Sequence, residues 1–355
     1  MSKNWKSRLS IPLISILAGF VLGAIIMLCL GYDPIMTYEA LFTGAWGDPN
    51  SIGETLRQAT PLILTGLGFS VATSAGFFNI GGAGQYLVGW LSSIWFVLSF
   101  PSLPGVVLIT GAIAAGAIAG GIWSGIAGVL RAYLKTNEVI TTIMLNYIAL
   151  YLSNWIVKSF LANGDADYSK SIPQSASLRS PFLMELTNNS TFHYGLFIAI
   201  VIAIIMAFVM KKTTVGYEIR SIGLNSDASK YAGMSTKKVI ILAMTLSGLL
   251  AGIGGAVDGI GNYQNILVLA STPSVGFDGL AVALLAYGNP IGIVFASLLF
   301  ASLKIGGLNI PVVSNTPSEI VDIVIALIIF FVGASYLFEY ISKKMKTNKS
   351  KGGKA

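Results

Sequence analysis

Several side chains within the apolar stretches of this chain are polar but uncharged. Thr142 and Asn146 stand four residues apart, so they would share one face of a helix. Amide and hydroxyl groups donate and accept hydrogen bonds without carrying charge, which suits weak binding of an uncharged, hydroxyl-bearing ligand. The alternative is that these groups hydrogen-bond one helix to another. On the first interpretation, the candidate ligand-contacting residues are Asn79, Gln85, Thr142, Asn146 and Tyr147.

The residues needed for catalysis, metal binding and nucleotide binding are missing from the sequence. No G-x-x-x-x-G-K-[ST] motif occurs, so the chain lacks a phosphate-binding loop of that kind. The single cysteine, Cys29, lies in an apolar run and is expected to be buried. The single histidine, His193, is far from it in sequence and is expected to be hydrogen-bonded at a helix end. We therefore predict no catalytic residue, no metal site and no cofactor bound by this chain.

The composition identifies the class of protein that must position these residues. Hydrophobic residues make up 54% of the chain and charged residues only 10%, too few to cover a soluble globule. We therefore predict an all-α polytopic membrane protein, folded as a single transmembrane domain over residues 1–355. About ten transmembrane helices are expected, some short or broken, at residues 11–30, 56–75, 86–100, 105–130, 139–157, 195–210, 239–257, 279–287, 291–303 and 320–340.

Charge sets the expected sidedness of these helices. The tail 341–355 is rich in lysine and has no acid, whereas the loop 31–54 has four acids and no base, so the tail belongs inside and the loop outside. Both termini lie in the cytoplasm only if the apolar run after Gly279 breaks at Gly288-Asn289-Pro290. The spans then contain almost no ionisable side chain, which argues against proton or sodium coupling. The acidic residues near them fall at predicted ends: Glu138, Asp258, Asp278, Glu319 and Asp322.

Two of the predicted helices carry small residues along one face. In residues 105–130 they are Gly116, Gly120, Ser124 and Gly128, and in residues 239–257 they are Gly248, Gly252 and Gly255. Within lipid, such a face lets another helix approach closely. We expect both helices to pack tightly, either as a moving interface or as a static one.

The loop 211–238 has an unusual concentration of charge. It holds six Lys or Arg and two acids in an otherwise apolar chain. The lysine pairs at its two ends are explained as signals of the cytoplasmic side. Its middle, residues 216–233, combines charges with Ala228, Tyr231 and Ala232 at helical spacing and ends at Gly233. We predict a short amphipathic helix here that docks into a groove on a soluble partner.

Four motifs together resemble a known family. They are PLILTGLGFSVATSAGFFNIGGAGQ at residues 61–85, TNEVITTIMLNYIA at 136–149, GYEIRSIGLNSDASKYAGMSTKKV at 216–239 and GFDGLAVALLAYGNPIG at 276–292. In this order they are similar to the membrane permease subunits of ABC importers for simple sugars and nucleosides, of the branched-chain type. The resemblance is strongest to bacterial nucleoside importers.

That resemblance implies an assembly in the bacterial plasma membrane. It implies a second permease subunit, often non-identical, a cytoplasmic subunit that binds ATP and Mg, and an extracellular substrate-binding lipoprotein, with contacts to membrane lipid and none to nucleic acid. The predicted path would then lie within the permease. The family's coupling segment corresponds here to residues 216–233, including Gly216, Glu218, Arg220, Gly223, Asn225, Ala228 and Gly233.

The resulting expectation is the permease subunit of an ATP-driven nucleoside importer, with ATP hydrolysis in a partner. Two alternatives remain: a permease for simple sugars of the ribose or galactose type, and a facilitator or channel that works alone. An intramembrane enzyme would need a nucleophile placed beside a base, which the sequence does not offer.

Overall fold

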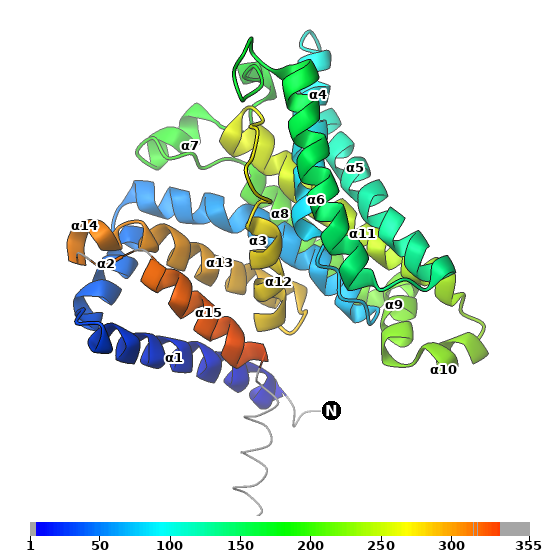
Figure 1. Ribbon diagram of the computed structural model, residues 1–355, viewed down its shortest axis with the longest axis horizontal. Helices are drawn as coiled ribbons and strands as arrows, with labels where there is room; N and C mark the ends of the chain where they lie inside the picture. The colour runs from blue at the N-terminus through cyan, green and yellow to red at the C-terminus, as the bar shows by residue number, and fades with distance from the viewer. Residues whose placement is uncertain (1–4, 315, 318, 334–355) are drawn as a thin grey trace, which may run out of the picture. The chain divides into compact units, whose positions relative to one another are not determined.

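The helices of the protein account for all of its regular structure among the residues described. The computed structural model describes residues 5–314, 316–317 and 319–333, so the basic tail 341–355 lies outside the described residues. Figure 1 shows the arrangement. The α-helices are α1 (Trp5–Cys29), α2 (Pro34–Trp46), α3 (Pro49–Ser74), α4 (Gly82–Ser99), α5 (Gly105–Leu134), α6 (Glu138–Ile156), α7 (Pro181–Leu186), α8 (Gly195–Lys212), α9 (Thr214–Leu224), α10 (Ser226–Tyr231), α11 (Thr236–Asp258), α12 (Val275–Leu285), α13 (Pro290–Gly307), α14 (Ile310–Ser314) and α15 (Glu319–Gly333).

Five continuous helical segments are long and apolar enough to cross a bilayer. They are Gly105–Leu134, Glu138–Leu161, Gly195–Lys212, Thr236–Tyr263 and Pro290–Gly307. Shorter apolar helices lie at Ile14–Cys29, Val275–Leu285 and Asp322–Phe331. Each predicted span coincides with a helix over its described residues, and residues 334–340 of the last span lie outside the described residues. The polytopic all-α class is confirmed for the described residues.

The predicted break before Pro290 is also present. α12 ends at Leu285, and α13 begins at Pro290. Between them Tyr287 and Gly288 have positive φ angles of 49° and 67°. Asn289 accepts a hydrogen bond from the Ile291 amide at 3.2 Å. Proline lacks an amide donor and restricts the preceding residue, so it starts a new helix here.

The chain packs as two compact units, divided after Gly44 and after Ala301. In the first unit, α1 packs closely on α15: a Cβ at Gly19 would lie 2.4 Å from Ile328, and one at Gly23 would lie 2.6 Å from Val324. In the second unit, α11 is the central helix and contacts α3, α4 and α5. In this unit the hairpin of α9 and α10 lies at one end and the loop after α6 at the other (Figure 1).

The two predicted small-residue faces lie against each other, except at Gly255, which packs against the backbone of α4 at Tyr86. A Cβ at Gly120 would lie 2.4 Å from the Gly248 carbonyl oxygen, and one at Gly252 would lie 2.3 Å from the Gly116 carbonyl oxygen. These are backbone contacts, so the helices α5 and α11 meet with no side chain between them. The expectation of close packing is confirmed.

Three local expectations were wrong. The segment 31–54, predicted as a loop, contains the helix α2. Cys29 is exposed rather than buried, because it lies at the end of α1. The helix predicted to end at Val257 continues through a π-helical turn at Gly259–Tyr263, so Asp258 lies inside the apolar segment rather than at its end.

Candidate functional site

The loop 211–238 was predicted to be cytoplasmic and to contain one short helix. It contains two helices. α9 ends at Leu224, and α10 begins at Ser226. Asn225 between them has extended backbone, and its side chain accepts hydrogen bonds from the amides of Asp227 at 3.1 Å and Ala228 at 3.0 Å. Asparagine favours this capping position, which explains the break. We call the two helices together the coupling hairpin, residues 214–231.

The coupling hairpin ends at the glycine that was predicted to stop it. α10 ends at Tyr231, and Gly233 has a φ of 85°. Its amide donates to the Lys230 carbonyl at 3.0 Å. A left-handed residue after a helix is normally glycine, because a Cβ is strained there.

α9 has one buried face and one exposed face. Ile219 and Ile222 are buried, and a Cβ at Gly216 would lie 2.2 Å from the Val209 carbonyl oxygen. Arg220 is exposed, and its Nε donates to the Gly216 carbonyl at 3.2 Å. Glu218 is half-buried and Ala228 is exposed. The hairpin is therefore anchored by its apolar face and presents its charged residues outward.

Two large apolar side chains are exposed on this surface: Leu224, which the sequence analysis missed, and Tyr231, which it placed in the predicted amphipathic helix. Leu224 is 88% exposed and Tyr231 is 94% exposed, at the ends of α9 and α10. Gly216, Ile219 and Ile222 are spaced three residues apart and form the buried face of α9. Leu224 falls outside this spacing, which is the sequence signal that it lies on another face.

The coupling hairpin is in backbone contact with the end of α3. A Cβ at Gly223 would lie 2.1 Å from the Ser74 carbonyl oxygen, and one at Gly76 would lie 3.3 Å from the Gly223 Cα. The chain continues from Gly76 to the turn that holds Asn79. The backbones of α9 and of the turn between α3 and α4 are therefore in direct contact.

The structure brings two of the predicted polar residues together at that turn. The amides of Asn79 and Gln85 exchange two hydrogen bonds, Asn79 Nδ2 to Gln85 Oε1 at 3.1 Å and Gln85 Nε2 to Asn79 Oδ1 at 3.0 Å. Asn79 Nδ2 also donates to Ser247 Oγ at 2.8 Å. Asn79 Oδ1 accepts from the Gly81 amide at 2.9 Å. The turn between α3 and α4 is thus tied to α11.

A second pair of contacts ties the same turn to α6. Asn146 Oδ1 accepts from the Gly84 amide at 2.9 Å, and its Nδ2 donates to the Ile80 carbonyl at 3.0 Å. Thr142 bonds within its own helix, at 2.8 Å to the Glu138 carbonyl. Tyr147 is 52% exposed and lies apart from the other four. We call Asn79, Gln85, Asn146 and Ser247 the amide network.

The predicted polar residues were interpreted either as contacts for a ligand or as hydrogen bonds between helices. Asn79, Gln85, Thr142 and Asn146 are each at most 3% exposed. Their polar groups are paired with protein partners. Asn79 and Asn146 make hydrogen bonds to other helices or turns, as expected for helix packing, whereas Thr142 bonds within α6. Contact with a transported ligand stays a prediction for them and for Tyr147.

Asp258 is a buried carboxylate that the sequence analysis placed at a helix end. It accepts a hydrogen bond from the Tyr86 hydroxyl of α4 and is 3% exposed. Its Oδ1 has no hydrogen bond of ordinary geometry among the described residues, although the Asn262 side chain is close enough to interact with it. Contrary to the prediction, the apolar segment Thr236–Tyr263 therefore holds a buried ionisable side chain.

A second charged cluster surrounds His193 ahead of α8. Glu54 accepts from Arg57 Nε at 2.7 Å and from the Thr191 amide at 2.6 Å. Burial raises the pKa of Glu54, but these contacts outweigh it and hold that pKa below its usual value. His193 Nδ1 accepts a hydrogen bond from the Gly195 amide at 3.0 Å, whereas Nε2 has no hydrogen-bond partner among the described residues. The prediction that His193 is hydrogen-bonded therefore holds for one ring nitrogen only.

An all-helical membrane fold with an exposed helical hairpin agrees with the family that the chain matches. A model of the branched-chain amino acid transport system permease component matches residues 51–333, and the chain belongs to this family. It is therefore a multi-pass permease subunit of the plasma membrane, not an enzyme. The ATPase of such transporters is a separate ATP-binding subunit, and a substrate-binding protein is a further partner.

Three relatives cover almost the whole chain. The nucleoside ABC transporter permease protein NupB of Lactococcus lactis is 47% identical, over 99% of this chain and 100% of its own. The guanosine ABC transporter permease protein NupP of Bacillus subtilis is 45% identical, over 96% and 97%. A glucose ABC transporter permease protein of Haloferax volcanii is 32% identical, over 92% and 88%.

Proposed function

We propose that this chain is the permease subunit of an ATP-driven nucleoside importer. The observation that carries the proposal is the identity of 47% and 45%, over nearly the full chain, to permeases whose names specify nucleosides and guanosine. The glucose permease supports a sugar importer as the second candidate, but its identity of 32% is markedly lower.

The proposed complex adds partners that this chain requires. A second, non-identical permease would complete the path, and a substrate-binding lipoprotein would deliver the nucleoside from outside. ATP and Mg would bind only to the cytoplasmic subunit, since this sequence has no phosphate-binding loop of its own. We further propose ten spans with both termini inside, which places the coupling hairpin in the cytoplasm.

The proposed mechanism is transmission from the coupling hairpin to the amide network. The exposed residues Arg220, Leu224 and Tyr231 would contact the ATP-binding subunit. Its movement would reach Ser74 and Gly76 through Gly223, because no side chain separates the two backbones. The network joins the next turn to α6 and α11, so the helices around the predicted path would move together.

Uptake into proteoliposomes tests the proposed function. The complete complex with enclosed ATP should accumulate labelled guanosine when the binding lipoprotein is present, and the chain alone should not. Guanosine flux through the chain alone without ATP would identify a facilitator. Uptake of glucose but not guanosine by the complete complex would identify a sugar importer.

A charge reversal tests the coupling role of α9. Arg220→Glu should abolish substrate-stimulated ATP hydrolysis while leaving assembly of the membrane subunits intact, because Arg220 is exposed and the hydrogen bond of its side chain to the Gly216 carbonyl stays within α9. Lys212→Glu, an exposed position at the end of α8 and outside the coupling hairpin, is the matched comparison for a general effect of charge. Normal coupling in the Arg220→Glu complex would remove Arg220 from the proposed mechanism.

A further inference from the structure

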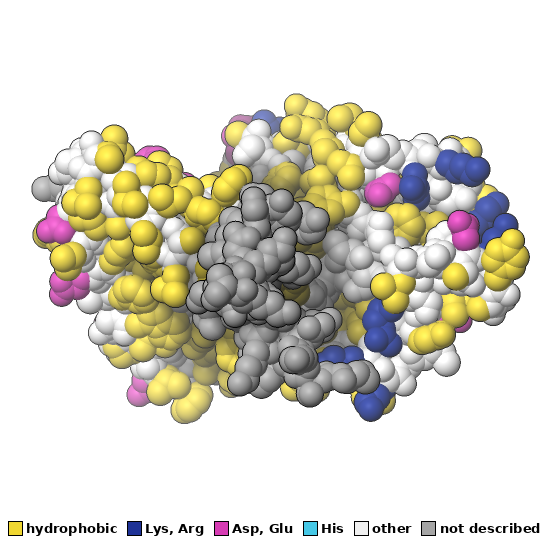
Figure 2. Space-filling view, turned by 90° about the horizontal axis from the view of Figure 1, so that it is seen from below, with side chains coloured by type: hydrophobic (Ala, Val, Ile, Leu, Met, Phe, Trp, Pro, Cys, Tyr) yellow, Lys and Arg dark blue, Asp and Glu magenta, His cyan; other side chains and the backbone are white. Residues whose placement is uncertain are grey.

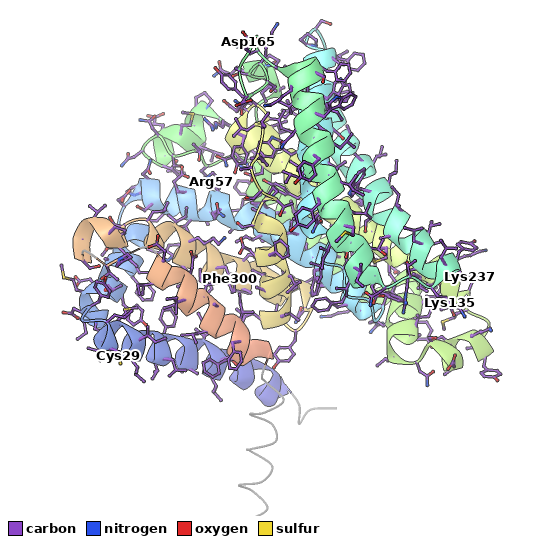
Figure 3. All side chains as sticks on the ribbon, in the orientation of Figure 1. Cys29, Arg57, Lys135, Asp165, Lys237 and Phe300 are labelled. Carbon is purple, nitrogen blue, oxygen red and sulfur yellow. The ribbon has the colours of Figure 1, made fainter. Side chains whose placement is uncertain are left out.

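A basic cavity lies beside the coupling hairpin. It has a volume of about 460 Å³ and is bordered by the end of α5, the start of α11 and α9. Its lining includes Arg131, Lys135 and Lys237, and no acidic residue. Figure 3 labels Lys135 and Lys237 beside each other at this end of the unit. Figure 2 shows Lys and Arg side chains gathered around α9 and α10.

The positive charge of this cavity is only partly neutralised. Arg131 Nε lies 3.3 Å from Glu138 Oε2, and its NH1 donates to the Thr136 carbonyl at 3.0 Å. Lys237 Nζ lies 4.6 Å from the centroid of the Tyr133 ring. No ion pair within the described residues joins Lys135 or Lys237 to a carboxylate. Two cationic groups therefore remain available to an anion.

The rest of the lining suits a phosphate group. Ser226 and Thr236 contribute hydroxyl groups that donate to phosphate oxygens. Lysine binds phosphate as a point charge, and hydrogen bonds to a charged group are stronger than neutral ones. The volume lies within the range of small-molecule sites. A small neutral ligand would leave the cationic groups without counter-charge.

The cavity lies at the contact between α9 and the turn after α3, so an anion bound in it would affect that contact. Gly223 and Gly76, which form the backbone contact between α9 and the turn after α3, also line it. A ligand in the cavity touches both sides of the proposed transmission contact. It would stabilise one arrangement of the hairpin against the membrane helices.

We propose that the basic cavity binds a phosphate group and thereby regulates the coupling of ATP hydrolysis to transport. The phosphate belongs either to an anionic phospholipid headgroup or to a phosphorylated solute. The regulatory part rests on the proposed function, whereas the binding part does not. The simpler explanation, that these lysines only mark the cytoplasmic side, predicts no binding specific to the cavity.

The experiment compares two sources of phosphate on the complete transporter complex in nanodiscs. In the lipid arm, thermal stability and ATPase activity are measured in phosphatidylcholine with and without phosphatidylglycerol. In the solute arm, guanosine 5′-monophosphate and guanosine are titrated in phosphatidylcholine, so that the phosphate is the difference between the ligands. The variant is Lys135→Gln with Lys237→Gln. The matched control is Lys211→Gln with Lys212→Gln, two exposed lysines that do not line the cavity.

The expected result is a response that the cavity variant loses and the control keeps. The wild type should be stabilised by phosphatidylglycerol, by the monophosphate, or by both, with an apparent affinity at least about tenfold weaker in the cavity variant. The responding arm identifies the source. The variant Lys135→Arg with Lys237→Arg keeps both positive charges and should keep the response. It shows whether the glutamine variant lost the response through its missing charge or through misfolding.

Equal responses from wild type, cavity variant and control, or no response in either arm, would overturn the proposal. Failure of the proposed function gives a different pattern, because ligand-dependent stabilisation needs no transport. A cavity that binds phosphate in a complex that does not move guanosine would refute the nucleoside importer and leave the binding site standing.

Discussion

His193 shows how burial sets the behaviour of a single residue. Its ring is buried, and burial, together with the positive charges of Arg57 and Arg179, lowers the pKa of His193 from 6.5 to about 3. Between these values the unfolded chain binds a proton that the folded chain does not. The free energy of unfolding must therefore fall as the pH drops below 6.5.

The pH dependence of unfolding provides the test. From about pH 6.5 to about pH 5, the loss should be about 2 kcal/mol, measured as denaturant or thermal unfolding in detergent. His193→Asn, whose amide oxygen can accept the Gly195 amide, should abolish this slope. Glu54 contributes little in this window, because its lowered pKa affects stability only as the pH falls through the ordinary glutamate value of 4.5 and below. An unchanged slope in the variant would show that another group is responsible.

At the scale of helices, the contact of α5 with α11 depends on missing side chains. A Cβ at Gly248 would lie 2.3 Å from the Gly120 carbonyl oxygen, a backbone atom that cannot rotate away. Gly248→Ala should separate the helices and cost about 1–3 kcal/mol or more. The measurement is the apparent melting temperature in detergent together with the yield of monodisperse protein.

A neighbouring glycine of α5 serves as the matched control for that change. The Cβ of Gly121→Ala would have its nearest contact at 3.5 Å, an ordinary van der Waals distance. This variant should keep the wild-type melting temperature, or gain slightly because alanine favours helix. Equal destabilisation by the two substitutions would mean that general helix crowding, not the backbone contact, matters.

At the scale of the whole molecule, the proposed sidedness can be measured with single cysteines. In a Cys29→Ser background, Lys230→Cys on the coupling hairpin and Asp165→Cys in the loop after α6 are both exposed. An impermeant maleimide should label Asp165→Cys in intact cells and Lys230→Cys only in inside-out vesicles. Labelling of both from the same side would contradict the proposed number of spans between them.

The sequence by itself determined the membrane class, the long apolar helices and the break before Pro290, because apolar length, Gly and Pro act locally. It also identified Gly120 and Gly248, since small residues at fixed spacing form a face in any helix. It could not pair those faces, because which helices meet is a property of tertiary packing.

Only the tertiary structure decided the surroundings of Asn79, Asp258 and Gly223. Asn79 reaches Ser247 across 168 positions of sequence. Asp258 is buried because a π-helical turn prolongs α11 and places its carboxylate against Tyr86. Gly223 meets the end of α3 through backbone atoms, which leave no pattern of side chains. Residue types state what a group can bind, whereas burial and distant partners decide what it does bind.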